Sequence, residues 1–419
     1  MLLTRRLGGA LGAVVLGAGL AAGPLVPTAA SYAAAGPDCT DSGSGGAVTG
    51  ANTPYDELGI GPAQARLPAG PASAGKGVDV FVVDDGVGAH LAHDSATGGQ
   101  VQDDHGTTAA GIVGGGDASV GRKQVPVGYA PGVRIHDVRA YDVPWSGSGS
   151  AQGATPSPQL LVGALRQVGR EMRGVRHAIV LVPFVVDSTP ALDKAVDALS
   201  SALVIAPTGD RPTAAGQPGV ARFYPGDNSD STPPPGQDAA GSVGPADDDA
   251  VLGVGVASWS FGNDPAGPLP NSDVDVAAPV GGGISYDRDG KACVVTTPSA
   301  DWAASEVAGV AALTWSAWPH LAADQLRTRL ELTADGGGIR EGDTEGYGVV
   351  QPLAAVTVPA AALRAGGTTP AAPRRATAPD PPADVLAGTR HTAVWWGLLG
   401  GGALVVALLL RPLLSRRRR

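Results

Sequence analysis

The chain has 419 residues, of which 43% are hydrophobic, so it is long enough to bury one large core and too long to be only a small binding module. Its formal net charge is -10 and its middle part contains no basic patch, which argues against nucleic acid as a partner. Aromatic residues make up only 4% while glycine and proline are abundant, which suits an α/β protein with long loops.

The first segment, residues 1–35, has the features of a secretory signal peptide. Arg5 and Arg6 precede an apolar run, and small-residue cleavage sites follow it. We therefore expect export, with an N-terminal membrane anchor as the alternative. Residues 36–52 are rich in glycine, serine and threonine, which predicts a flexible N-terminal extension.

Cys39 and Cys293 are the two cysteines of the chain. Export makes a disulfide between them permissible. Such a bond would fasten the N-terminal extension beside the strand that leads to Ser299, and two separate thiols remain the alternative.

Two polar residues stand at the ends of predicted elements in the first half of the chain. Apolar residues 78–83 predict a buried strand that ends at Asp84, and open α/β sheets place their active sites at the carboxyl ends of central strands. His105 opens a helix of small residues, "HGTTAAGIV". A further strand is expected at residues 134–138.

The middle of the chain leads to a third polar residue. The pattern predicts a helix at residues 159–173, a strand at 177–184 and a helix at 190–202. The strand "LVIAPTGD" then ends near Asp210. The long stretch 211–249, rich in proline, glycine and aspartate, is expected to be an exposed loop.

A buried helix is predicted over Ser299–Leu313, where Trp302 and Val310 recur at helical spacing among small residues. Gly309 suggests that another backbone passes close by. Because a β-rich run precedes the helix, the sequence predicts a strand–turn–helix that presents a side chain at the start of the helix.

The C-terminal region predicts a membrane anchor. Residues 358–392 form a linker rich in proline and alanine, and residues 393–413 form an apolar segment long enough to cross a bilayer. Trp395 and Trp396 lie at one edge of this segment, and the basic tail 414–419 follows the other. We therefore expect a single-pass protein of the cell membrane with an extracytoplasmic domain and a cytoplasmic tail, with a buried core helix as the alternative.

Five segments resemble, in the same order, the motifs of subtilisin-like serine proteases. They are the strand that ends at Asp84, the "HGT" of His105, "GYAPGVRI", "NSDVDVAAPV" and the helix "SADWAASEVAGVAAL", and the closing "EGYGVVQPLAAV" extends the likeness. With the signal peptide, the C-terminal helix and the basic tail, the chain resembles the mycosins, subtilisin-like proteases attached to the type VII secretion systems of actinobacteria. The resemblance implies a three-layer α/β fold over residues 53–357, with a mostly parallel central sheet flanked by helices, and a C-terminal transmembrane helix.

The resemblance also assigns the candidate site, and the chain departs from it at two positions. Asp84 and His105 match the family's orienting carboxylate and general base. The nucleophilic serine is replaced by Asp301, a poor nucleophile, and the asparagine that stabilises the oxyanion is replaced by Asp210. Ser299 would substitute as nucleophile only if its turn were rebuilt.

Two further expectations follow from these departures. The family's strand edge that pairs with substrate is occupied here by Pro183, Phe184 and Val185, and proline has no N–H to donate. Three carboxylates around His105 would raise its pKa and make it an imidazolium instead of a base.

Three functions remain open. The favoured one is an inactive mycosin homologue with a structural, scaffolding or peptide-binding role, whose partners are type VII secretion membrane components and the cell membrane, with no cofactor or metal. The second is an active serine-type endopeptidase that uses Ser299 on secreted proteins or peptides. The third is a cation site formed by Asp84, Asp210 and Asp301.

Overall fold

The structure is a computed structural model, and it describes a large central part of the chain. The described residues are 37–39, 47–95, 101–144, 153–212, 217, 219–220, 223, 237–262, 267–340 and 342–364. The predicted signal peptide (1–35) and the predicted membrane segment with its basic tail (393–419) lie outside them. Within the described ranges, no helix is both long and apolar enough to span a bilayer.

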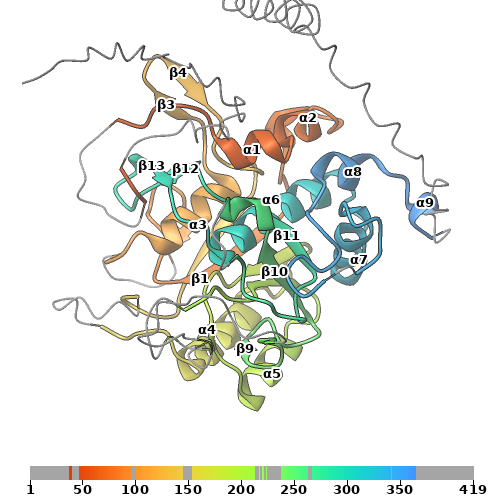
Figure 1. Cartoon of the computed structure of the whole chain (residues 1–419). Coiled ribbons are helices and arrows are strands. Elements are labelled where there is room, and N and C mark those ends of the chain that lie inside the picture. Colours follow the sequence, from red (N-terminus) through yellow and green to blue (C-terminus); the bar gives the residue numbers. More distant parts are fainter. Residues whose placement is uncertain are drawn as a thin grey trace, which may run out of the picture. The chain divides into compact units, whose positions relative to one another are not determined.

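A seven-stranded parallel sheet forms the centre of the described part of the chain, in the order β11–β10–β8–β6–β1–β5–β2 (Figure 1). All six residues of the central strand β1 are buried, as expected for a parallel sheet covered on both faces. The strands are β1 (Asp79–Asp84), β2 (Asp94–Ser95), β5 (Arg134–Arg139), β6 (Ala178–Leu181), β8 (Leu203–Pro207), β10 (Val251–Val256) and β11 (Val276–Ala278).

Helices cover both faces of this sheet and give the molecule three layers. On one face, α3 (His105–Gly114) and α6 (Ala300–Ala317) pack with Val80 and Val82 of β1. On the other face, α4 (Pro158–Glu171) and α5 (Pro190–Asp197) pack with the alternate residue Phe81. The predicted α/β arrangement with a parallel central sheet and flanking helices is therefore confirmed, and Figure 1 shows α4 and α5 below the sheet and α3 and α6 above it.

The helix α6 runs through the centre of its layer, and its sequence explains why. Fifteen of its 18 residues are buried, and most of them are small or apolar. A Cβ atom on Gly309 would lie 2.6 Å from Cβ of Tyr129, so the close approach predicted at this glycine is present. The neighbour is the side chain of Tyr129, however, and not a second backbone as the sequence suggested.

The N-terminal extension is fastened to a β-hairpin that leads to α6. The hairpin consists of β12 (Gly283–Tyr286) and β13 (Ala292–Val295). Val294 donates its N–H to the carbonyl of residue 37 at 2.8 Å, and Cys39 donates to the carbonyl of Val294 at 3.0 Å. Cys39 and Cys293 form a disulfide that spans 254 residues of sequence.

The remaining elements are short, with the exception of the helix α7. They are α1 (Thr53–Glu57), α2 (Ile60–Gln64), η1 (Pro71–Ser73), β3 (Ala118–Val120), β4 (Lys123–Val125), β7 (Val186–Asp187), β9 (Val243–Gly244), η3 (Ser258–Phe261), α7 (Ala323–Thr333), α8 (Pro352–Thr357) and α9 (Ala360–Arg364). The helix α9 lies where the sequence predicted the beginning of an extended linker.

Candidate active site

Asp84 and His105 lie together at the carboxyl edge of the sheet. Asp84 is the last residue of β1 and His105 the first of α3, and the Asp84 Oδ2 atom lies 2.9 Å from His105 Nδ1. The phenol of Tyr141, which follows β5, donates to Asp84 Oδ1 at 2.6 Å. Asp84 is fully buried, so it holds the imidazole by one nitrogen and leaves Nε2 directed away from the sheet.

The group that faces Nε2 of His105 is a carboxylate. Asp301 is the second residue of α6, and its Oδ2 atom lies 3.5 Å from His105 Nε2. The indole ring of Trp302 lies against the imidazole, with 4.6 Å between the ring centroids. His105 is therefore enclosed by two carboxylates and an aromatic ring, and the serine hydroxyl of the family is absent from this position.

These contacts determine the protonation of His105. Burial by itself lowers the pKa of the imidazole, but the charges and hydrogen bonds of Asp84 and Asp301 outweigh it, and the pKa of His105 lies well above its ordinary value of 6.5. A raised pKa favours the imidazolium form, and a histidine that carries its proton cannot act as a general base.

Asp210 does not join this cluster in the way the sequence suggested. Its Oδ2 atom accepts a hydrogen bond from Ser299 Oγ at 2.6 Å, and its Oδ1 atom accepts the Ala300 N–H at 2.9 Å. The expectation that three carboxylates surround His105 is therefore wrong: two contact the ring, while the third caps the N-terminus of α6. The free N–H groups of a helix N-terminus attract a carboxylate, which explains why Asp210 binds the start of α6 and not the imidazole.

The carboxyl group of Asp210 has an unusual acidity. Burial and the nearby charge of Asp301 raise its pKa to about 7, although its bonds to Ser299 and Ala300 act in the opposite direction. The pKa of Asp301 is also raised, chiefly by burial, and the neighbouring His105 limits this rise. The site therefore holds an Asp210 carboxyl group with a pKa of about 7 beside a histidine whose pKa is raised by Asp84 and Asp301.

Ser299 is the N-cap residue of α6 and serves its helix. Its Oγ atom accepts the Asp301 N–H at 3.1 Å while its hydroxyl donates to Asp210. None of the hydrogen bonds found among the described residues joins Ser299 to His105. The structure thus places Ser299 near the site but pairs it with a different partner from the one that the serine-protease hypothesis requires.

Three residues contribute to the site that sequence reasoning did not identify: Tyr141, Asp85 and Trp302. Asp85 is fully buried, accepts the Gly106 N–H on Oδ1 at 2.7 Å, and has no partner for Oδ2 among the described residues. Burial and the adjacent charge of Asp84 raise its pKa well above the ordinary value. The doubled "DD" after the strand and the tryptophan directly after Asp301 were the available signals.

The strand expected at residues 177–184 is shorter than the sequence indicated. It ends at Leu181, and the next residue donates its N–H to the carbonyl of Ile205 in β8 at 3.0 Å. Phe184 turns inward and lies edge-on to Tyr141, with ring centroids 5.0 Å apart. The segment after β6 is thus committed to contacts within the chain.

The third hypothesis, a cation site, finds no geometric support. Among the described residues, no group of three or more histidine, cysteine, aspartate or glutamate side chains is arranged to hold a metal ion. Both carboxyl oxygens of Asp210 accept hydrogen bonds at the start of α6, so Asp210 serves this helix and does not combine with Asp84 and Asp301 into a cation site.

Comparison with known proteins points to one family. No protein-family model matches the chain. No curated protein matches it either. Among solved structures, MycP1 with its N-terminal propeptide removed is similar at 25% identity and a TM-score of 0.52, over 74% of this chain and 98% of that chain. The MycP3 protease from the type VII (ESX-3) secretion system is similar at 24% identity and a TM-score of 0.53, over 78% and 93% of the two chains.

A third similar structure is MycP1 from Mycobacterium smegmatis, at 23% identity and a TM-score of 0.53, over 77% of this chain and 88% of that chain. The structural neighbours of this chain are thus mycosins, the subtilisin-like proteases of type VII secretion systems. The resemblance predicted from the motifs is confirmed, and the fold is subtilisin-like.

Proposed function

We propose that this chain is a membrane-anchored, mycosin-like component of a type VII secretion system that has lost proteolytic activity and acts as a scaffold or a peptide-binding module. One observation carries the proposal: the carboxylate of Asp301 faces Nε2 of His105 at 3.5 Å, in the place of a serine hydroxyl. A proton held between these groups blocks the base, and a carboxylate does not form the stable acyl intermediate of a serine protease.

A second departure supports the loss of activity. Removing one oxyanion donor from a serine protease costs about 100- to 1000-fold in rate. Here the side chain in that position is an acid, and its oxygens are engaged by Ser299 and Ala300. In the ionised form it would repel a developing oxyanion, and these hydrogen bonds would have to break before it could turn toward a substrate.

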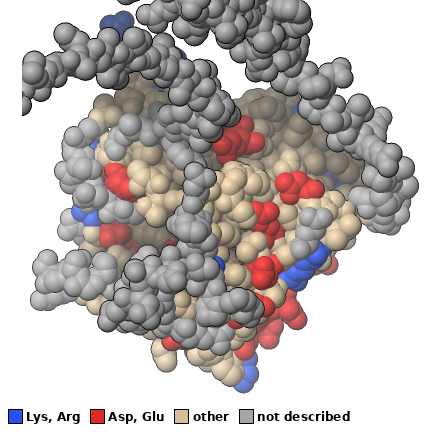
Figure 2. All heavy atoms as spheres, viewed as in Figure 1, with Lys and Arg blue, Asp and Glu red and all other residues tan. Residues whose placement is uncertain are grey.

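The proposed setting follows from the two ends of the sequence. A signal peptide over residues 1–35 would export the domain, and a membrane segment over residues 393–413 would tether it by its C-terminus. The net charge of -10 and the prevalence of acidic over basic residues on the face drawn in Figure 2 favour protein partners over nucleic acid. Type VII secretion membrane components and exported proteins or peptides are the partners that the mycosin likeness suggests.

The test is proteolysis by the purified full-length protein in detergent, measured on an unfolded protein mixture. We expect no cleavage by the wild type above that of a sample without protein, and none by the His105→Gln variant. Cleavage by the wild type would contradict the proposal, and its loss or retention in His105→Gln would show whether His105 takes part.

A second candidate function, an active endopeptidase, is favoured by one observation. The Ser299 hydroxyl donates to Asp210 at 2.6 Å, and the pKa of Asp210 is about 7, a value suited to a general base at neutral pH. In this alternative Asp210, and not His105, would take the proton of Ser299.

Covalent labelling with a fluorophosphonate distinguishes the two functions. The inactive protein should remain unlabelled. Labelling that is abolished by Ser299→Ala and retained in His105→Gln would establish the Ser299–Asp210 pair as a working nucleophile and base.

A further inference from the structure

Away from the candidate active site, α6 carries a second buried acid whose charge the mechanism does not use. Glu306 lies five residues after Asp301, is only 3% exposed, and has no hydrogen-bond partner for Oε2 among the described residues. Tyr129 is 1% exposed, and its phenol oxygen likewise has no partner among them. Buried polar atoms of this kind are costly unless a partner satisfies them.

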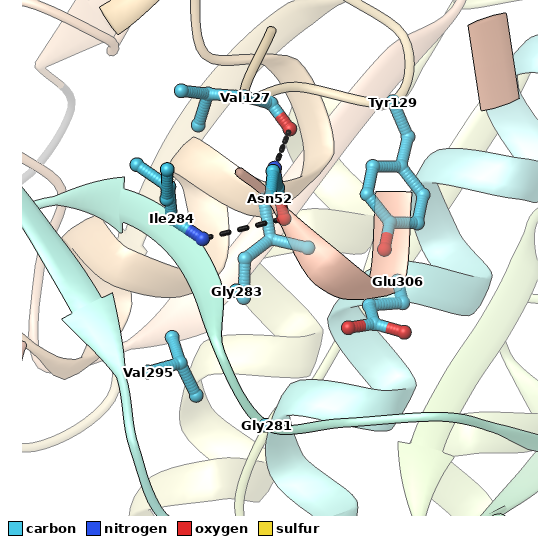
Figure 3. Close-up of a pocket in the computed structure, with 9 residues that line it drawn as sticks. Asn52, Val127, Tyr129, Gly281, Gly283, Ile284, Val295 and Glu306 are labelled. Carbon is cyan, nitrogen blue, oxygen red and sulfur yellow. Dashed lines mark hydrogen bonds between the residues drawn. The ribbon is translucent and has the colours of Figure 1, made fainter. Parts of the chain in front are cut away.

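Both groups line one small cavity. The cavity has room for about one water molecule. Figure 3 shows the carboxyl group of Glu306 and the phenol of Tyr129 directed toward one another across it. Its wall is otherwise mostly apolar and consists of Asn52, Ile112, Val127, Gly281, Gly283, Ile284 and Val295.

The cavity lies where five parts of the fold meet: the N-terminal extension, α3, the segment before β5, the β12–β13 hairpin and α6. Asn52, the N-cap residue of α1, donates to the carbonyl of Val127 at 3.4 Å and accepts the N–H of Ile284 at 3.3 Å (Figure 3). The backbone of Tyr129 is fixed by its own N–H, which donates to Ile112 of α3 at 3.0 Å. A ligand in the cavity would therefore touch α6, the segment before β5 and the end of the N-terminal extension at once.

We propose that the cavity binds a single water molecule that joins the carboxyl group of Glu306 to the phenol of Tyr129, and thereby fastens α6 to the segment before β5. The neutral acid donates one hydrogen bond and accepts another, which matches what a water molecule and a phenol offer. A monovalent cation suits the cavity less, because most of its wall supplies no oxygen ligands.

The electrostatic surroundings favour the neutral form of Glu306. Burial raises the pKa of its carboxyl group well above the ordinary value, the nearby phenol of Tyr129 acts in the opposite direction, and the charge of Glu57 on α1 raises the pKa further. The other titratable groups that act on the pair, Tyr129 and Tyr55, are phenols and are uncharged at neutral pH. The wall residues from α3 and from the β12–β13 hairpin do not titrate.

Ionisation of Glu306 would place an unpaired charge in this cavity, so the stability of the protein in solution should depend on pH. A carboxyl group whose pKa is raised by folding stabilises the folded state below its unfolded pKa, and this contribution is lost as the pH rises toward the folded pKa. Over that interval the unfolding constant of the wild type should rise, relative to Glu306→Gln, by up to about tenfold per pH unit. A glutamine retains the hydrogen bonds but cannot ionise.

The experiment combines denaturation with crystallography of the full-length protein. Unfolding is measured between about pH 5 and about pH 9 for wild type, Glu306→Gln and, as a control, Asp56→Asn, which removes an exposed carboxylate of α1. We expect the pH dependence of Glu306→Gln to be flatter than that of the wild type, and Asp56→Asn to follow the wild type. Parallel curves for wild type and Glu306→Gln would overturn the proposal.

Crystals of the wild type decide the occupant without any variant. A single density peak within hydrogen-bond distance of both Glu306 and Tyr129 is expected. An empty cavity would overturn the proposal, and so would an anomalous signal in the cavity after soaking in rubidium chloride, which would identify a cation site instead.

Discussion

The charge of His105 is the feature of the site most open to direct measurement, and Asp301→Asn is the change that perturbs it. The carboxylate of Asp301 lies 3.5 Å from His105 Nε2, and its side chain is 26% exposed. An opposite charge this close raises a histidine pKa by about 1 to 3 units, which corresponds to about 1.4 to 4 kcal/mol. Asparagine keeps the shape and removes the charge, so the pKa of His105 should fall by that amount.

The assay is an NMR titration of the imidazole signals, with His105 assigned by the loss of its signal in His105→Gln. In the wild type the pKa of His105 should lie well above 6.5. Asp103→Asn is the matched control, because the Asp103 carboxylate accepts the backbone N–H of His105 at 3.2 Å and not a ring nitrogen. Asp103→Asn should change the pKa of His105 less than Asp301→Asn does.

The raised pKa of His105 also determines how Asp301→Asn changes the stability of the protein at different pH values. Because folding raises the pKa of His105, the ion pair stabilises the protein fully below about pH 6.5, and this contribution is lost as the pH rises through the folded value. Asp301→Asn should therefore destabilise the protein in acid more than in base. A wild-type pKa at or below the ordinary value, or one unchanged in Asp301→Asn, would refute the account of the site.

Three further predictions concern stability. Asp210→Asn should flatten the fall in stability between about pH 4 and 7, because folding raises the pKa of the Asp210 carboxyl group from 3.8 to about 7. The effect on the free energy of unfolding is at most about 4 kcal/mol. Denaturation at both ends of this pH range measures it, and an equal fall in stability in the variant would be the contrary result. Replacing Cys39 and Cys293 by alanine should cost about 2–5 kcal/mol because it opens a loop of 254 residues, and an unchanged melting temperature under non-reducing conditions would oppose this. Gly309→Ala should destabilise the protein by about 1–3 kcal/mol, because the added Cβ atom would collide with Tyr129. Thermal unfolding tests this, with Gly163→Ala as the control, since a Cβ atom at Gly163 meets no neighbour.

The order of motifs along the sequence was sufficient to predict the sheet and the meeting of Asp84, His105 and Asp301. Each of these residues begins or ends an element, and the parallel sheet brings such ends to one edge. The ends of the elements themselves were less predictable. The strand expected at 177–184 stops at Leu181, shortly before Pro183, which has no N–H to donate to a further ladder bond.

The hydrogen-bond partners of Asp210 and the burial of Glu306 could not be predicted from the sequence, because both depend on how distant segments pack. Asp210 follows a strand as an active-site residue would, but the competing attraction of the N-terminus of α6 depends on where two loops meet in space. Glu306 appears in the sequence as a polar residue on a helix, and only the three-dimensional packing shows that its side chain points inward beside Tyr129. Tyr141 gave no motif at all, because its role rests on a single hydrogen bond to Asp84.

The most direct test of the central claim is a gain of function. The double variant Asp301→Ser, Asp210→Asn restores the side chains that subtilisin-like proteases have at these two positions, and its proteolytic activity can be measured beside that of the wild type. The account predicts cleavage that appears only in the double variant and is lost again when His105→Gln is added. Proteolysis by the unmodified protein at a comparable rate would contradict it.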